Sequence, residues 1–266
     1  MLVKDKVVVV TGAGSGMGRE LTLELVRRGA RVAAVDMREE SLEQTQTLAR
    51  ALGGKVETFL MDVSDAKAVS ELPKKVEKAL GSADALINNA GIIQPFVRVN
   101  ELSLEDAHRV MRINFDGPLM LIKAFLPGLI AKKEAHLMNV SSMGAYAPVP
   151  GQSVYGASKA ALKLLTEGLR SELKPTGVGV TIVFPGAVAT NIAVNSGMVI
   201  PEGAAENSKQ KTTAADVAAR EMVDAIEKNK PRITIGPDAK IMDILSRLNP
   251  VKAADTIYKQ MANLLG

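Results

Sequence analysis

The fold is decided by residues 7–20, which read VVVVTGAGSGMGRE. The four valines are typical of a buried strand, and the amphipathic run from Arg19 to Arg28 is typical of a helix. The spaced glycines therefore lie at a strand-to-helix turn. Glycine suits such a turn because side chains would keep the pyrophosphate of a dinucleotide away from the free N–H groups of the helix. By itself the stretch is also compatible with a plain tight turn.

Short aliphatic runs recur along the whole chain, with helical segments between them. The runs are apolar throughout, which is typical of strands buried on both faces. This alternation predicts an α/β fold: a doubly wound, seven-stranded parallel sheet between two helical layers (α/β/α), in a single domain spanning residues 1–266. Ser103 with Asp106 and Thr213 with Asp216 resemble capping boxes at two helix starts. The seven predicted strands are Val7–Val10, Arg31–Val35, Val56–Leu60, Ala85–Ile87, His136–Val140, Val180–Phe184 and Ile233–Ile235.

The composition restricts the classes of partner. The 266 residues carry a net charge of +4 and only 3% aromatic residues, so a nucleic-acid partner is not expected. The chain has no cysteine, and its two histidines, His108 and His136, form no metal-ligand pattern, so no metal site is expected. The longest apolar stretch, Leu119 to Ala131, is interrupted by Lys123 and Pro127 and is shorter than the ~18 residues of a membrane span. We therefore expect a cytoplasmic protein without stable membrane insertion.

A carboxylate ends the second predicted strand. Asp36 stands 18 residues after Gly18, where it can accept both hydroxyls of an adenosine ribose. Its charge would repel a 2′-phosphate, and the glycine loop offers Ser15 rather than a basic residue; Arg38, two residues past Asp36, partly compensates. We therefore expect NAD rather than NADP. Without the upstream glycines, Asp36 would instead be interpreted as a helix cap or a solvated loop residue.

Tyr155 and Lys159 stand four residues apart in a helical segment, so their side chains rise from one face. The pKa of free tyrosine is about 10, and bringing it near 7 requires roughly 4 kcal/mol of phenolate stabilisation. We expect Lys159, together with the positive nicotinamide of an oxidised cofactor, to supply it. Tyr155 would then take the proton of an alcohol while a hydride leaves the carbinol carbon for NAD. A Tyr and a Lys at this spacing are by themselves more often surface residues.

Seven motifs occur along the chain in a fixed order. They are Gly12 with Gly16 and Gly18, Asp62-Val63, Asn88-Asn89-Ala90-Gly91, Asn114, Ser142, Tyr155-Gly156-Ala157-Ser158-Lys159, and Pro185-Gly186 with Thr190. From about Lys6 to Thr190 the chain thereby resembles the short-chain dehydrogenase/reductase (SDR) family in its main form. The resemblance implies a Rossmann-type fold and an oxidoreductase that moves a hydride between NAD(H) and a secondary alcohol or ketone.

The resemblance also implies roles for individual residues. Tyr155 is the general acid and base, Lys159 lowers its pKa and binds the nicotinamide ribose, and Ser142 orients the reacting oxygen. Asn114 holds a water of a proton relay; the alternative is a buried amide in a kinked helix. Ser141 competes with Ser142, but the 13-residue gap from Ser142 to Tyr155 is the one the family uses. The implied cofactor-binding residues are Gly12, Ser15, Gly16, Met17, Gly18, Asp36, Asp62, Val63, Asn89, Ala90, Gly91, Tyr155, Lys159, Pro185, Gly186, Val188 and Thr190.

Residues 186–211 escape the alternation and are expected to form a substrate loop, because long loops in compact domains are usually functional. The residues expected around the substrate are mostly apolar, which favours an apolar ketone or secondary alcohol. Residues 237–266 are expected to form a helical tail, for which packing, an oligomer contact and a lipid-facing surface stay open. By resemblance we expect a homodimer or homotetramer. The predicted substrate residues are Ile93, Gln94, Met143, Ala145, Val149, Gln152 and Ile192.

Two other functions are compatible with the same motifs. One is an epimerase or dehydratase that keeps the fold and cofactor, as extended SDR relatives do. The other is a non-catalytic binding module that senses the nucleotide. The chain length and the single Tyr-Lys pair argue against the first, and the intact Tyr155 and Lys159 argue against the second.

Overall fold

Seven parallel strands form one sheet in the computed structural model, which describes residues 1–190, 192–197 and 212–261. The strands lie in the order β3-β2-β1-β4-β5-β6-β7. Strands β2 and β3 are added on one side of β1 and strands β4 to β7 on the other, so the strand order has a switch point between β1 and β4, as in doubly wound folds. All seven predicted strands are confirmed. Their bounds are β1 Val7–Thr11, β2 Arg31–Asp36, β3 Lys55–Leu60, β4 Ala85–Asn88, β5 Ala135–Val140, β6 Val178–Pro185 and β7 Arg232–Ile235.

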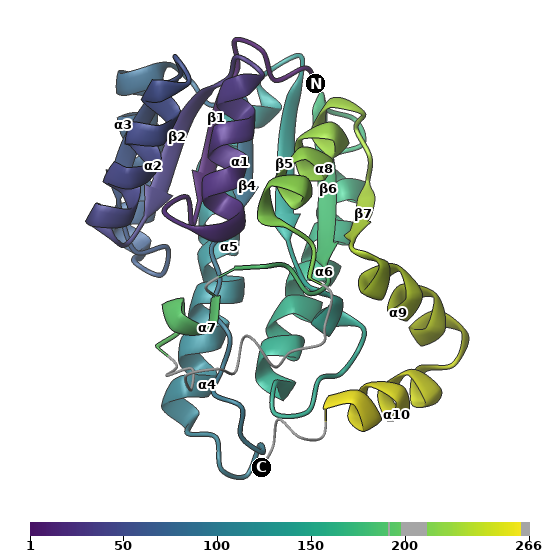
Figure 1. The fold of residues 1–266 in the computed structure, drawn as a ribbon. Helices are drawn as coiled ribbons and strands as arrows, with labels where there is room; N and C mark the ends of the chain where they lie inside the picture. The colour runs from purple at the N-terminus through teal and green to yellow at the C-terminus, as the bar shows by residue number, and fades with distance from the viewer. Residues whose placement is uncertain (191, 198–211, 262–266) are drawn as a thin grey trace.

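Helices cover both faces of the sheet (Figure 1). One layer contains α1 (Gly16–Arg27), α2 (Glu39–Ala51) and α8 (Ala215–Glu227). The other contains α3 (Ala66–Leu80), α5 (Gly117–Ile130) and α6 (Ser153–Glu172). The remaining elements are α4 (Leu104–Met111), the π-helical turn η1 (Arg112–Asp116), the 3-10 turn η2 (Met143–Ala145), α7 (Ile192–Asn195), α9 (Pro237–Leu248) and α10 (Pro250–Met261).

The valines of β1 explain why the predicted strands are apolar at every position. Val8 and Val10 belong to the core on the α1 side of the sheet, and Val7 and Val9 belong to the core on the α5 side. All four are completely buried. Successive side chains of a strand point to opposite faces, so a strand covered on both faces needs apolar residues throughout.

Parallel strands bring their carboxyl ends to one edge of the sheet. The glycine turn follows β1, Asp36 is the last residue of β2, and Asn88 is the last residue of β4. Ser141 and Ser142 directly follow β5. Most of the motifs found in the sequence therefore meet at this edge.

One of the two predicted helix caps is confirmed and the other is wrong. Ser103 caps α4, with its hydroxyl accepting a hydrogen bond from Asp106 N at 3.0 Å. Thr213 does not cap α8, which begins after Ala214 without a side-chain cap. Thr213 instead forms an isolated parallel bridge with Val188, because the chain is still extended at this point.

The apolar stretch at Leu119 to Ala131 lies in a longer helix than we expected. Helix runs continuously from Leu104 to Ile130 through α4, η1 and α5, and Pro127 does not end it. These 27 residues are long and apolar enough to cross a membrane by length and composition, a test that buried core helices also pass. In this fold, α5 packs Leu121 and Phe125 into the core beneath the sheet.

The predicted substrate loop and tail are described in part. Residues 186–190 and 192–197 of the loop are described and contain α7, whereas 191 and 198–211 lie outside the described residues. The tail forms α9 and α10 beyond β7 (Figure 1), and residues 262–266 also lie outside. Met242, Ala253 and Ile257 of the tail bury themselves against Ala147. One face of the described tail therefore packs on the body of the protein, and Ile241, Ile244, Leu248 and Val251 on these helices are exposed.

A buried histidine predicts a specific sensitivity to acid. His136 in β5 is 1% exposed and its Nε2 lies 2.8 Å from Thr181 Oγ1. Burial, with a contribution from the N-terminal ammonium, lowers its pKa to about 3. The unfolded chain therefore binds the extra proton first, and the free energy of unfolding falls as the pH drops below the normal histidine pKa of about 6.5.

We expect His136 alone to remove about 3 kcal/mol of stability between pH 6.5 and pH 4. Urea unfolding of His136→Asn at several pH values should show a shallower pH slope than the parent protein over this window. His108→Asn, at the exposed histidine, is the control and should keep the parental slope. Equal slopes for His136→Asn and the parent would contradict a neutral buried imidazole.

Candidate active site

The glycine turn brings the N-terminus of α1 close to β1 and to the turn after β4. Gly12 has a φ of +66°, and a Cβ there would lie 2.9 Å from Ala90 Cα. A Cβ on Gly18 would lie 1.9 Å from the carbonyl oxygen of Gly12. The backbone can approach this closely only without side chains, which is also what a pyrophosphate at a helix N-terminus requires. The turn therefore fits a dinucleotide.

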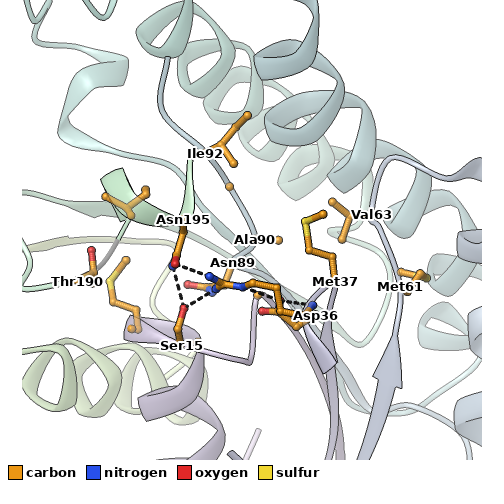
Figure 2. Close-up of a pocket in the computed structure, with 17 residues that line it drawn as sticks. Ser15, Asp36, Met37, Met61, Val63, Asn89, Ala90, Ile92, Thr190 and Asn195 are labelled. Atoms are coloured by element: carbon orange, nitrogen blue, oxygen red, sulfur yellow. Dashed lines mark hydrogen bonds and ion pairs between the residues drawn. The ribbon is translucent and has the colours of Figure 1, made fainter. Parts of the chain in front are cut away.

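Asp36 lines the groove beside this turn (Figure 2). Its buried carboxylate accepts hydrogen bonds from Gly14 N at 2.9 Å and from Arg38 N at 3.1 Å. Arg38 Nε lies 3.7 Å from Asp36 Oδ1, and Arg38 Nη2 donates to Ser15 Oγ at 3.0 Å. Arg38 and Ser15 both also bond to the side chain of Asn195 in α7. The carboxylate thus supports the glycine turn, and the guanidinium of Arg38 partly neutralises its negative charge.

Most of the residues predicted to bind the cofactor line this groove. Asp62 does not, because its carboxylate turns to the backbone N–H and hydroxyl of Ser64, each at 2.8 Å. The groove also contains Met37, Met61, Ile92 and Asn195, which we did not predict. Met37 and Ile92 directly follow predicted residues, whereas Asn195 has no signal in the sequence. The predicted residues that line the groove are Gly12, Ser15, Gly16, Met17, Gly18, Asp36, Val63, Asn89, Ala90, Gly91 and Thr190.

A second cavity adjoins the groove and is lined by three of the four predicted catalytic side chains. Tyr155 and Lys159 reach it from α6, and Ser142 reaches it from the end of β5, where it also caps η2 by accepting from Gly144 N at 3.0 Å. Groove and cavity share several lining residues, so they form one continuous site. The shared residues are Met17, Asn89, Gly91, Thr190 and Ile192, and the cavity adds the predicted Pro185, Gly186 and Val188.

Burial controls the protonation of the Tyr155–Lys159 pair. It raises the pKa of Tyr155 above its usual range, and a hydrogen bond with Ser142 opposes this rise. It also lowers the pKa of Lys159 to about 8. Lys159 Nζ donates to the carbonyl oxygen of Val140 at 3.0 Å and lies 6.0 Å from the centre of the Tyr155 ring. Burial therefore favours the neutral form of both groups, in opposition to the lowering of the Tyr155 pKa that we expect from Lys159 together with the nicotinamide.

Asn114 lies behind the cavity, in the π-helical turn η1. Its side chain is completely buried; Oδ1 accepts from Ile92 N and Nδ2 donates to Ile92 O, both at 2.9 Å. A Cβ on Gly91 would lie 3.1 Å from both Asn114 Oδ1 and Lys159 Nζ. The glycine therefore leaves space between the amide and the ammonium. The alternative interpretation, a buried amide in a distorted helix, describes the same contacts.

The predicted substrate residues separate into two groups. Ile93 and Ile192 line the cavity. Gln94 and Gln152 do not, because both are buried and bonded to backbone groups of neighbouring segments. Met143 and Val149 pack against the cluster formed by α9 and α10, and Ala145, in η2, is also outside the cavity lining. The sequence placed these residues near the site but did not show which way their side chains turn.

A glycine turn at a sheet's switch point, continuous with a cavity holding a Tyr-Lys pair, defines a dinucleotide-binding α/β protein. The family model described as short chain dehydrogenase matches residues 6–198. SadH of Mycobacterium tuberculosis is 35% identical over 92% of this chain and 91% of its own length. The rat dehydrogenase/reductase SDR family member 7B is 32% identical over 87% of this chain and 74% of its own length.

Solved structures agree with these relatives. A short chain dehydrogenase/reductase from Burkholderia phymatum in complex with NAD superposes with a TM-score of 0.82 at 28% identity, covering 93% of this chain and 96% of that one. Levodione reductase has a TM-score of 0.81 at 26% identity, covering 89% and 98% of the two chains. The chain therefore belongs to the short-chain dehydrogenase/reductase family of oxidoreductases.

The close packing at Gly18 can be tested against a second helical glycine. Gly18→Ala forces the helix away from Gly12 O, and we expect it to cost about 2 kcal/mol or more of unfolding free energy. Gly168→Ala in α6 has no atom within 4 Å of the added Cβ and should stabilise the protein by roughly 0.5–1 kcal/mol. Chemical unfolding of both variants measures the opposite signs. Two shifts of the same sign would contradict this account of the turn.

Proposed function

We propose that this protein is an NAD-dependent dehydrogenase or ketone reductase that acts on an apolar secondary alcohol or the corresponding ketone. The observation that carries the proposal is that the groove at the glycine turn adjoins the cavity with Ser142, Tyr155 and Lys159, since the two share lining residues. A substrate carbon in that cavity lies beside the groove in which a dinucleotide fits. Proximity of this kind is the main requirement for hydride transfer.

Tyr155 is the proposed general acid and base. Its hydroxyl takes the proton of the substrate alcohol during oxidation and returns it to the oxygen during reduction. The Ser142 hydroxyl, which lines the same cavity as Tyr155, orients the same oxygen. When bound, oxidised NAD accepts the hydride and brings a positive charge. Lys159, once protonated, adds a second positive charge, and together these favour the phenolate that burial alone disfavours.

Asn114 and Gly91 support the proposed proton relay. The space that the missing Gly91 side chain leaves lies between Asn114 Oδ1 and Lys159 Nζ. A hydrogen-bonding chain through this space would link the ammonium to groups behind the cavity. We propose that Asn114 therefore both holds the backbone at Ile92 and helps to replace the proton on Lys159.

Asp36 supports NAD as the cofactor. Its buried carboxylate faces the groove, where ribose hydroxyls can donate to it and a 2′-phosphate would be repelled. Arg38 opposes this preference, because its guanidinium lies next to both Asp36 and Ser15. We propose that the carboxylate dominates because it is buried, whereas the Arg38 side chain is 40% exposed and its charge is better screened.

The walls of the cavity support an apolar substrate. Ile93, Ile192 and Val188 line it beside the catalytic side chains. Such walls suit a hydrophobic ketone better than a sugar or a charged acid. We also propose assembly as a homodimer or homotetramer, which rests on the family resemblance, and a cytoplasmic location, which rests on the sequence.

Removal of the Tyr155 hydroxyl tests the proposed chemistry. A panel of apolar secondary alcohols, followed by the absorbance of NADH, should identify a substrate for the parent protein. Tyr155→Phe should then lower kcat by about 10³-fold or more while leaving the Kd of NAD within about twofold, because the phenol acts only on the reacting proton. Tyr258→Phe, at an exposed tyrosine on α10, is the control and should keep full turnover. Activity retained in Tyr155→Phe would refute the assigned role.

Removal of the Asp36 carboxylate tests the cofactor preference. Asp36→Ala should lower the ratio of kcat/KM with NAD to kcat/KM with NADP by at least about tenfold, equivalent to ~1.4 kcal/mol, because the repulsion of the 2′-phosphate is lost and Arg38 remains. The double variant Asp36→Ala with Arg38→Ala should lose most of the gain with NADP. An unchanged ratio in Asp36→Ala would mean that the carboxylate does not face the ribose.

A further inference from the structure

The helix that carries Tyr155 and Lys159 begins without a cap of its own. α6 starts at Ser153, so Tyr155 lies in its first turn. The N-cap residue, Gln152, makes no side-chain capping bond. The first N–H groups of a helix have no partner within the helix and need one from elsewhere.

Gln94 supplies that partner from a distant segment. Its Oε1 accepts hydrogen bonds from Val154 N at 2.9 Å and from Tyr155 N at 3.0 Å. Its Nε2 donates to Gly151 O at 2.9 Å, and Gln152 Nε2 donates to the backbone oxygen of Gln94 at 2.7 Å. Gln94 is completely buried. Both polar atoms of its side chain are thus used on residues 151–155.

The segment that contains Gln94 is itself fixed to the cofactor groove. Gln94 lies three residues past Gly91, in the stretch after β4 whose Asn89, Gly91 and Ile93 line the cavity. Asn114 holds Ile92 on one side, and Ile93 N donates to Ser196 Oγ at 3.0 Å. Gln94 therefore connects one wall of the groove to the first turn of the catalytic helix.

We propose that Gln94 is a positioning residue, whose side-chain amide holds the start of α6 so that the Tyr155 side chain reaches the cavity. The inference rests on the proposed role of Tyr155. Gln94 acts through the backbone of Val154 and Tyr155 and does not touch the reacting atoms. A displacement of about 1 Å at a reacting group can lower a rate about 100-fold, so a shift of this turn has a kinetic effect beyond its effect on stability.

Two substitutions separate positioning from stability. Gln94→Met keeps the length of the side chain and removes its three side-chain hydrogen bonds. Gln94→Glu keeps an oxygen that can accept from Val154 N and Tyr155 N but loses the donor to Gly151 O. The carboxylate also brings a negative charge beside the first turn, which should shift the titration of Tyr155 to higher pH.

We expect Gln94→Met to lower kcat by about 10- to 100-fold and to leave the KM of NAD within about threefold of its value in the parent protein. Hydrogen exchange should quicken mainly at residues 153–156. Gln94→Glu should have a higher kcat than Gln94→Met. Its kcat should rise with pH at a higher pH than in the parent protein. The control is Asp65→Ala, which removes a carboxylate oxygen that accepts from two first-turn N–H groups of α3, Lys67 N and Ala68 N, and should leave kcat and its pH profile unchanged.

Parental kcat and pH profile in both Gln94 variants would overturn the proposal. If Gln94→Met fails to fold, the pH profile of Gln94→Glu decides. If the parent protein oxidises no alcohol and reduces no ketone, the proposed function fails instead. The titration of Tyr155, followed by ultraviolet absorbance, then still tests Gln94. The difference between each protein and its Tyr155→Phe counterpart isolates the signal of Tyr155. A Tyr155 pKa that is unchanged in Gln94→Glu would overturn the positioning role.

Discussion

The close approach of α1 to β1 is the constraint on which the rest of the structure depends. Gly12 and Gly18 lie so near each other, and so near Asn89 and Ala90, that a side chain on either glycine would overlap its neighbours. This contact brings the N–H groups and the positive end of the α1 dipole to the carboxyl edge of the sheet. The adjoining strands, β1 and β4, flank the switch point, so the groove and the cavity open there.

Buried polar side chains hold the walls of this site. Asp36 bonds to the glycine turn, Asn114 to the backbone at Ile92, and Gln94 to the start of α6. A buried polar group is costly unless it is hydrogen-bonded, so each of these groups specifies one arrangement of the loop it holds. The loops at the carboxyl edge are therefore held in place by buried side chains rather than by regular secondary structure.

Much of the fold could be predicted from the sequence, because strands that are buried on both faces of the sheet consist of apolar residues throughout. Seven apolar runs predicted seven strands, and Tyr155, Lys159 and Ser142 were placed by spacing and by family resemblance. The sequence was less informative about the direction in which side chains on loops point. Gln94 and Gln152 were predicted to meet substrate and instead bond to backbone, and the carboxylate of Asp62 turns to Ser64.

The sequence by itself determined the layers, the strand positions, the nucleotide turn and the family, because periodicity and glycine spacing are local properties. Only the tertiary structure decided how Arg38, Ser15 and Asn195 meet, and which group caps the helix of Tyr155. It also decided that Tyr155 is buried, which raises its pKa. These properties depend on contacts between segments far apart in the chain, and on the exclusion of water that those contacts produce.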